Sequence, residues 1–183
     1  MKSKLALAAI GLFLSVMPAF AQSTTENGIT VICPWTQDTR EGVEIAAVYF
    51  DVRVDRTASR NLTGARTELA NDAQLSLFRR VGGVLRRESV PLIGIPAGRT
   101  VRLVPGGYHV LLTGLGEPLV VGGTFNLFLE FDGEGGFEVP VQVVPAGTGR
   151  PCGGPPSQAD VPYRGPGYVP GPRWVPRGSY WWR

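Results

Sequence analysis

Apolar and polar residues alternate along several short stretches of the chain. Residues 124–131 (TFNLFLEF) alternate almost without exception, and residues 43–54 (VEIAAVYFDVRV) do so more loosely with many β-branched side chains. Because successive side chains of a strand point to opposite faces, this pattern predicts β-strands with one apolar face. Residues 22–183 carry no convincing 3.6-residue apolar stripe, so the pattern predicts an all-β fold.

Turn signals separate these stretches. DGEGG after residue 131 predicts a hairpin between 124–131 and 137–144, and RRVGG predicts another between 74–78 and 84–87. Residues 56–63 are polar and predict a loop. Pro140 has no N–H to donate, which places its strand at an edge or a bulge. Short strands with frequent turns are typical of a β-sandwich or barrel.

The clearest signal lies in residues 95–119, IPAGRTVRLVPGGYHVLLTGLGEPL. Val101 and Leu103 alternate with polar residues, and the following Pro-Gly-Gly fits a tight turn because glycine tolerates a positive φ. A second strand, 109–113, follows at once. The sequence therefore predicts a hairpin with His109 beside its turn, at the rim of the sheet.

This stretch resembles the signature region of the periplasmic copper chaperone (PCuAC) family, small cupredoxin-like proteins implicated in delivering copper(I) to the CuA centre of cytochrome oxidase. The shared string is similar to I-P-A-G…V-x-L-x-P-G-G-Y-H, followed by G-L…P-L, and a weaker likeness runs from Gly28 to about Val144. The resemblance implies a cupredoxin-like antiparallel β-sandwich, copper handling and a copper-accepting periplasmic partner.

The first 21 residues have the features of a secretory signal: Lys2 and Lys4, an apolar run over 5–17, and the small residues Ala19 and Ala21. The run is shorter than the roughly 20 residues that span a bilayer, so cleavage is favoured over a membrane anchor. We expect a periplasmic protein with a signal at 1–21, a β-sandwich domain at 22–145 and a tail at 146–183.

Cleavage of the signal would change the metal chemistry that the chain can perform. Both methionines, Met1 and Met17, lie within it, which leaves one histidine, two cysteines and no thioether. Copper(I) is a soft ion that prefers thioether and imidazole donors to hard oxygen donors. The processed chain would therefore lack the sulfur ligands that the resemblance implies.

The ligand spacing of the family, counted outward from His109, falls on Ser76, Arg87 and Leu111. Of these four residues only His109 keeps a good copper donor. Leu111 has no donor atom, and Ser76 has a hard hydroxyl. Arg87 would place a positive charge beside the cation, and two unit charges 4 Å apart repel by about 4 kcal/mol at an effective dielectric of 20. We expect weak or no copper(I) binding.

His109 has two interpretations: a remnant metal ligand, or an exposed hairpin histidine kept for its own hydrogen bonds. The second is favoured because a single imidazole rarely holds a metal tightly. A changed metal site that combines His109 with Cys33 or carboxylates stays open. A Ser76–His109 nucleophile pair lacks any oxyanion motif, so we expect no enzymatic activity.

Cys33 and Cys152 bracket the predicted domain. An even pair in an exported chain most simply forms a disulfide, and thiols that bind metal or exchange electrons are the alternative. The long enclosed loop gives a stabilisation of about 4 to 5 kcal/mol in the chain-entropy account.

Charge is unevenly placed. Residues 22–144 hold eleven arginines against fourteen carboxylates, whereas residues 145–183 hold five arginines against Asp160. Within the domain, the four arginines of 79–87 form a basic cluster. A solvated face is favoured there over an anion or nucleic-acid site, because no aromatic platform accompanies the cluster.

The tail interleaves proline and glycine with aromatic and basic residues. So much proline predicts disorder or polyproline II structure, yet disordered tails are usually poor in aromatic residues. Arginine with tryptophan and tyrosine favours membrane interfaces, cation–π contacts and partner grooves. An adhesive and a passive tail both stay open, and a binding module without metal, acting on an envelope component or membrane surface, is the alternative function; its candidate residues are Arg173, Trp174, Arg177, Tyr180, Trp181 and Trp182.

Overall fold

A computed structural model describes residues 23–133 and 135–152. Within these residues the chain forms strands and turns and no helix, which confirms the predicted all-β fold. No helix among the described residues is long and apolar enough to cross a membrane. The predicted signal (1–21) and the tail from residue 153 onward lie outside the described residues.

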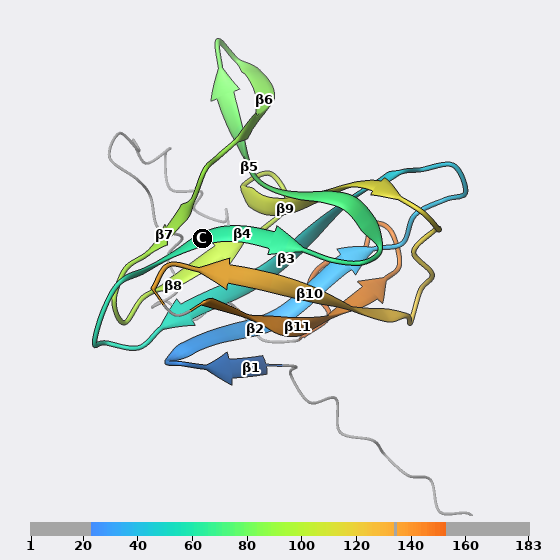
Figure 1. Cartoon of the computed structure of the whole chain (residues 1–183). Helices are drawn as coiled ribbons and strands as arrows, with labels where there is room; N and C mark the ends of the chain where they lie inside the picture. The colour runs from blue at the N-terminus through green and yellow to red at the C-terminus, as the bar shows by residue number, and fades with distance from the viewer. Residues whose placement is uncertain (1–22, 134, 153–183) are drawn as a thin grey trace, which may run out of the picture.

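Eleven strands form one sheet that folds back on itself (Figure 1). The hydrogen-bonded order is β6-β5-β9-β8-β3-β2-β11-β10-β4-β7, with β1 paired to β2. The strands are β1 (Ser23–Glu26), β2 (Ile29–Gln37), β3 (Ile45–Val54), β4 (Arg60–Arg66), β5 (Ala70–Val81), β6 (Val84–Ser89), β7 (Ile93–Ile95), β8 (Thr100–Leu103), β9 (Tyr108–Leu115), β10 (Thr124–Phe131) and β11 (Gly135–Val144).

The main core lies between the two halves of this folded sheet. Alternate residues of β3 and β9 point into it from one half, and alternate residues of β10 and β11 from the other. Phe50, Val110, Leu127 and Val139 are among its fully buried members. The strict alternation in 124–131 therefore arises because β10 packs one face against the core and leaves the other at the surface.

Most neighbouring strands are antiparallel, as the resemblance implies, but the sheet is mixed. β11 runs parallel to β2, with Gln142 opposite Trp35. The pairing of β11 with β2 begins at Gln142, so Pro140 lies outside it and faces Asn126 of β10. β11 lies between β2 and β10 and its register with β10 is continuous, so the edge or bulge predicted for this strand is wrong. The missing N–H of Pro140 is tolerated because β11 pairs only with β10 at that residue.

Two further local predictions are wrong. β8 and β9 do not form a hairpin: both pair with β3, one after the other along the same edge. The predicted turn is present, with Gly107 N–H donating to the Val104 carbonyl at 2.9 Å and Gly106 at φ +80°, but it carries the chain onward along β3. The loop predicted for 56–63 ends at Ser59, because β4 begins at Arg60 and pairs with β10 and β7.

Candidate functional site

Strand register brings the four positions of the implied ligand set onto one sheet face. On β9, Val110 and Leu112 point into the core, so His109 and Leu111 point to the opposite, outer face. Ser76 of β5 lies directly opposite His109. Arg87 of β6 lies two positions further, opposite Phe78 of β5. Ser76 and Arg87 are far from His109 and Leu111 in the sequence, but the strand pairing brings the four residues close together on this face.

His109 is buried, which corrects the expectation of an exposed histidine at the sheet rim. Its side chain is 1% exposed, and its ring stacks on Phe78 with centroids 4.9 Å apart and planes 20° apart. The Tyr49 ring lies 6.4 Å away. The imidazole is covered because β5 runs alongside β9, a pairing that the local alternation in residues 95–119 does not reveal.

Hydrogen bonding fixes the tautomer of His109. Nδ1 lies 3.0 Å from the Gly107 carbonyl oxygen, which can only accept, so Nδ1 carries the proton and Nε2 keeps its lone pair. Burial lowers the pKa of His109, the bond to Gly107 partly opposes this, and the Arg87 charge lowers the pKa further. His109 is therefore neutral at pH 7, and the positive charge of Arg87 acts on it directly.

The donor atoms around His109 do not fit a copper(I) ion. Ser76 and Leu111 are both buried, and they supply a hydroxyl and a hydrocarbon side chain. Within 23–133 and 135–152, no three His, Cys, Asp or Glu residues cluster closely enough to hold a metal. One imidazole beside a guanidinium is a poor match for an ion that prefers several soft donors.

The predicted disulfide between Cys33 and Cys152 is present, with Cα atoms 5.9 Å apart. Cys33 sits at an irregularity of β2 between Ile32 and Trp35 and has a φ of +55°. Because the sulfur of Cys33 is bonded to that of Cys152, it provides no thiolate for a changed site with His109. The disulfide packs with Trp35, whose ring lies 4.9 Å from that of Tyr49. A row of rings therefore leads from the disulfide towards His109.

A buried ion cluster beside the disulfide was not anticipated from the sequence. Asp51 of β3 is 6% exposed and accepts from Arg150 at 2.7 Å, while Arg102 of β8 lies 3.6 Å from the same oxygen. These residues line a cavity of about 320 Å³ together with Trp35. From the sequence alone, an isolated aspartate on a strand is expected to be exposed to solvent. The pairing of β3 with β8 is what places Arg102 opposite Asp51.

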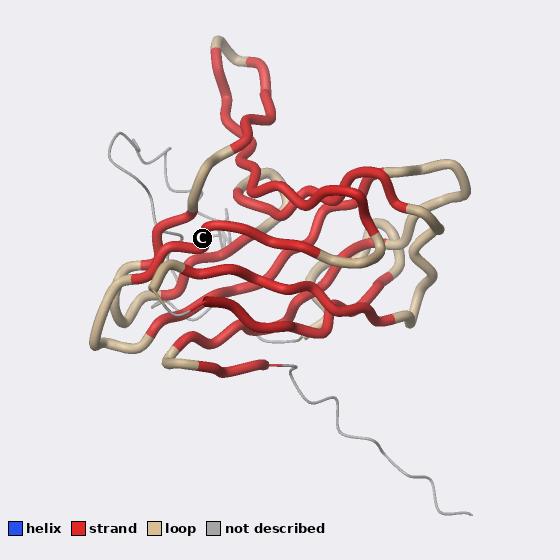
Figure 2. Tube along the Cα trace, in the orientation of Figure 1, coloured by secondary structure: helices blue, strands red, loops and turns tan. Residues whose placement is uncertain are grey.

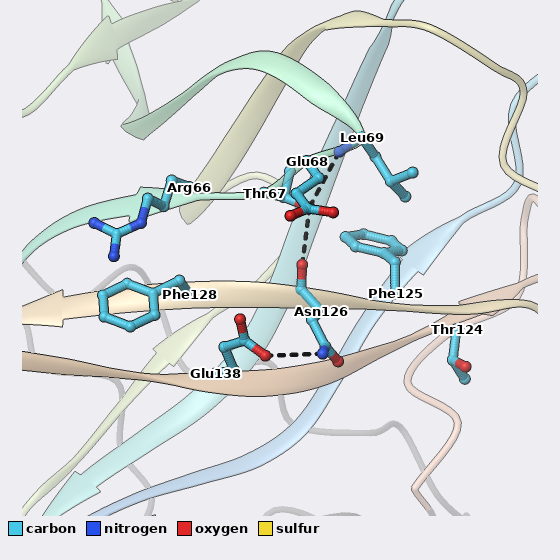
Figure 3. A pocket seen from close by; sticks show the side chains of 9 residues that line it. All are labelled: Arg66, Thr67, Glu68, Leu69, Thr124, Phe125, Asn126, Phe128 and Glu138. Atoms are coloured by element: carbon cyan, nitrogen blue, oxygen red, sulfur yellow. Dashed lines mark hydrogen bonds between the residues drawn. The ribbon is translucent and has the colours of Figure 1, made fainter.

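A larger groove, of about 680 Å³, lies between the β4–β5 turn and β10 (Figure 3). Arg66 closes one end by lying 3.8 Å above the Phe128 ring while pairing with Glu130. Asn126 donates to Glu138 at 2.8 Å, and its carbonyl accepts from the Thr67 hydroxyl. These polar groups therefore bond to one another across the groove.

The tail residues named as candidates lie outside the described residues, but the structure places the segment that leads to them. Residues 145–152 run back along β2 from its end: Ala146 N–H donates to Asp38, and Gln37 donates to the Thr148 carbonyl at 3.3 Å. Arg150 and Cys152 complete the attachment. The tail therefore starts from the outer face that carries the aromatic row.

The arrangement of strands is that of a PCuAC-like domain. The copper-bound PCuAC domain from PmoF2 superposes with a TM-score of 0.57 at 21% identity, over 67% of this chain and 97% of that one. Apo-DR1885 from Deinococcus radiodurans gives a TM-score of 0.54 at 26% identity, over 81% of this chain and all (100%) of that one. These similarities confirm the fold that the residue 95–119 string implied.

A sequence-family profile matches residues 29–143 and carries the description "Putative lipoprotein LpqE-like". The chain is also 30% identical over 118 residues to the "Putative lipoprotein Lxx21020" of Leifsonia xyli subsp. xyli (strain CTCB07), covering 63% of this chain and 70% of that protein. This chain belongs to the LpqE-like family.

Proposed function

We propose that this protein is an exported binding protein of PCuAC-like fold that has lost the copper(I) site of the copper chaperones. The observation that carries the proposal is the outer face of β5, β6 and β9, where Ser76, Arg87 and Leu111 surround His109. The strands hold the four positions in place, so the loss lies in the side chains. A protein of this kind acts by binding and performs no catalysis.

Export to the periplasm by a cleaved signal at 1–21 is part of this proposal. It is supported by the residue pattern of the signal, by the disulfide and by the word lipoprotein in the descriptions of the family and the Leifsonia relative. If the protein does carry copper, a copper-accepting periplasmic protein is its expected partner, by analogy with the copper-bound PCuAC domain.

Copper(I) titration against a competing chelator tests the loss of the site. We expect no sub-micromolar binding by the purified protein, because the imidazole of His109 has no thioether or second imidazole beside it to complete a copper(I) site. The variant Ser76→His/Arg87→Met/Leu111→Met restores the implied donors and is expected to gain binding that His109→Ala then removes. Sub-micromolar binding by the natural sequence that is lost in His109→Ala would overturn the proposal.

A second candidate function, binding through the tail, is favoured by the attachment of residues 145–152 to the outer face. The disulfide and the Arg150–Asp51 pair hold the start of the tail beside Trp35 and Tyr49. This attachment fixes the point from which the tail leaves the domain, and the candidate binding residues of the tail are Arg173, Trp174, Arg177, Tyr180, Trp181 and Trp182. An envelope component or membrane surface fits their mixed aromatic and basic chemistry.

Truncation after Cys152 tests the tail while keeping the disulfide. We expect the truncated chain to sediment more weakly with isolated envelope membranes than the full-length chain, because the aromatic residues leave with the tail. A full-length variant with Trp174, Trp181 and Trp182 changed to serine should be weakened to a similar degree. Unchanged sedimentation of both variants would remove the support for this candidate.

A further inference from the structure

The β5–β6 hairpin extends from the body of the domain (Figures 1 and 2). Among the described strands β6 pairs with β5 alone, and all six residues of β6 are exposed. We call residues 79–88 the arm. A two-stranded ribbon without a buried face is marginally stable in water, so the arm contributes little to the core of the domain. Its residues are free to serve an interaction.

The tip of the arm is apolar and narrow. Val81 and Val84 lie directly opposite each other, and together with Leu85 they are 51–59% exposed. Gly82 and Gly83 join the strands with φ values of +59° and +85°, as a tight two-residue hairpin turn requires. Three aliphatic side chains are thus presented together at the end of a thin projection.

Behind this tip the arm carries concentrated positive charge. Arg79 lies directly opposite Arg86, an arrangement that destabilises a hairpin because like charges repel across the strands. Glu88, 3.5 Å from Arg79, is the one carboxylate among the four arginines of the arm. The rest of residues 22–144 holds seven arginines against thirteen carboxylates. The arm and the remainder of the domain therefore have opposite net charges.

We propose that the arm docks tip first on an anionic lipid bilayer. Val81, Val84 and Leu85 enter the boundary between headgroups and acyl chains, while Arg79, Arg80 and Arg86 pair with lipid phosphates. Arg79 and Arg86 lie two positions behind Val81 and Val84, and two residues of a strand span about 7 Å. These arginines therefore reach the headgroups when the tip is buried about 5–10 Å deep, which is the usual depth of interfacial anchors.

Charge complementarity favours this occupant and sets its orientation. An anionic surface attracts the arm and repels the acidic remainder of the domain, so the domain stands away from the membrane on its arm. A nucleic acid would also attract arginines but would leave the aliphatic tip exposed to water. The inference does not depend on copper chemistry or on the tail.

Vesicle co-sedimentation of the full-length protein tests this inference. We expect binding to vesicles of phosphatidylglycerol and phosphatidylcholine, weak binding to phosphatidylcholine alone, and release at high salt. Each surface arginine contributes about fivefold in affinity, so Arg79→Gln/Arg80→Gln/Arg86→Gln should weaken binding on the order of a hundredfold. The matched control Arg40→Gln/Arg53→Gln/Arg56→Gln removes three exposed arginines outside the arm and should weaken binding much less than the arm variant. Arg87 is left unchanged because its charge acts on His109.

A second measurement reports insertion of the tip. Val84→Trp should shift its added fluorescence to the blue with anionic vesicles, and Val81→Ser/Val84→Ser/Leu85→Ser should weaken sedimentation while leaving the melting temperature nearly unchanged. Equal binding by the arm variants and the natural sequence would overturn the proposal, as would binding confined to the tail. Preference for duplex DNA over vesicles, or self-association through the tip in place of lipid binding, would also overturn it.

Discussion

At the scale of single residues, His109 shows how burial and a neighbouring charge act together. A neutral imidazole can stack on Phe78 and donate to Gly107 without placing an unpaired charge in a covered site. Protonation would place two positive groups, His109 and Arg87, on the same face of the β5–β6–β9 region. Burial and the Arg87 charge disfavour the imidazolium in the folded protein, and the hydrogen bond to Gly107 opposes them only in part.

The pH dependence of His109 follows from this difference. Because burial and Arg87 lower its folded pKa below the usual 6.5, the unfolded chain takes up the proton first as pH falls. The His109 contribution to stability is therefore complete above pH 6.5 and is lost as pH falls towards the folded pKa. His109 is the one histidine of the chain, so its NMR titration is assigned without ambiguity.

The same titration tests the role of Arg87. We expect a midpoint below 6.5 for the natural sequence and a higher midpoint for Arg87→Gln, because the substitution removes a repulsive charge. The exposed Arg40→Gln, distant in sequence, serves as the matched control and should leave the midpoint unchanged. A natural midpoint at or above 6.5 would contradict the burial that the structure assigns to His109.

Asp51 carries the second prediction at this scale. Asp51→Asn removes the charge that compensates Arg102 and Arg150 in a largely buried cluster, and breaking such a pair costs about 3 kcal/mol. Glu88→Gln, in contrast, affects an exposed pair with Arg79 and should cost less than about 1 kcal/mol. Urea denaturation of both variants measures the two values, and equal costs would show that Asp51 is not buried among its partners.

At the scale of elements, strands followed from the sequence and their partners often did not. The alternation in 124–131 predicted β10 residue for residue, and the glycine pair predicted the β5–β6 turn. The pairing of β8 and β9 with β3 was missed because alternation shows which face of a strand is buried and not which strand lies beside it. The burial of His109 was missed for the same reason, since β5 covers it from a distant part of the sequence.

Gly114 in β9 gives a prediction for this scale. Its φ is +70°, and an added Cβ would meet the Cβ of Asn71 at 2.9 Å, so Gly114→Ala combines backbone strain with a close contact that a side-chain rotation cannot relieve. We expect a loss of about 2 kcal/mol in unfolding free energy. Gly116→Ala, where an added Cβ meets nothing within 4 Å, should change stability by less than about 0.5 kcal/mol. Thermal and urea denaturation of the pair would contradict the assigned geometry if the two variants were equally stable.

At the scale of the whole molecule, the disulfide joins the beginning of the domain to its end. Cys33 and Cys152 are 119 residues apart in the chain, so the cross-link removes much of the freedom of the unfolded state. The chain-entropy account gives about 4 to 5 kcal/mol for a loop of this length. Both the aromatic row and the start of the tail depend on this link for their relative placement.

Cys33→Ser/Cys152→Ser is therefore expected to lower the free energy of unfolding by about 4 kcal/mol, as measured by urea denaturation. Residues 145–152 would then be held by their polar contacts to Asp38 and Asp51 without the covalent link, so amide hydrogen exchange at Ala146, whose N–H donates to Asp38, should be faster than in the oxidised protein. Reduction of the natural sequence is the matched control and should reproduce both effects. Unchanged stability with unchanged exchange would mean that the strand pairing of β2 with β11 holds this end of the domain by itself.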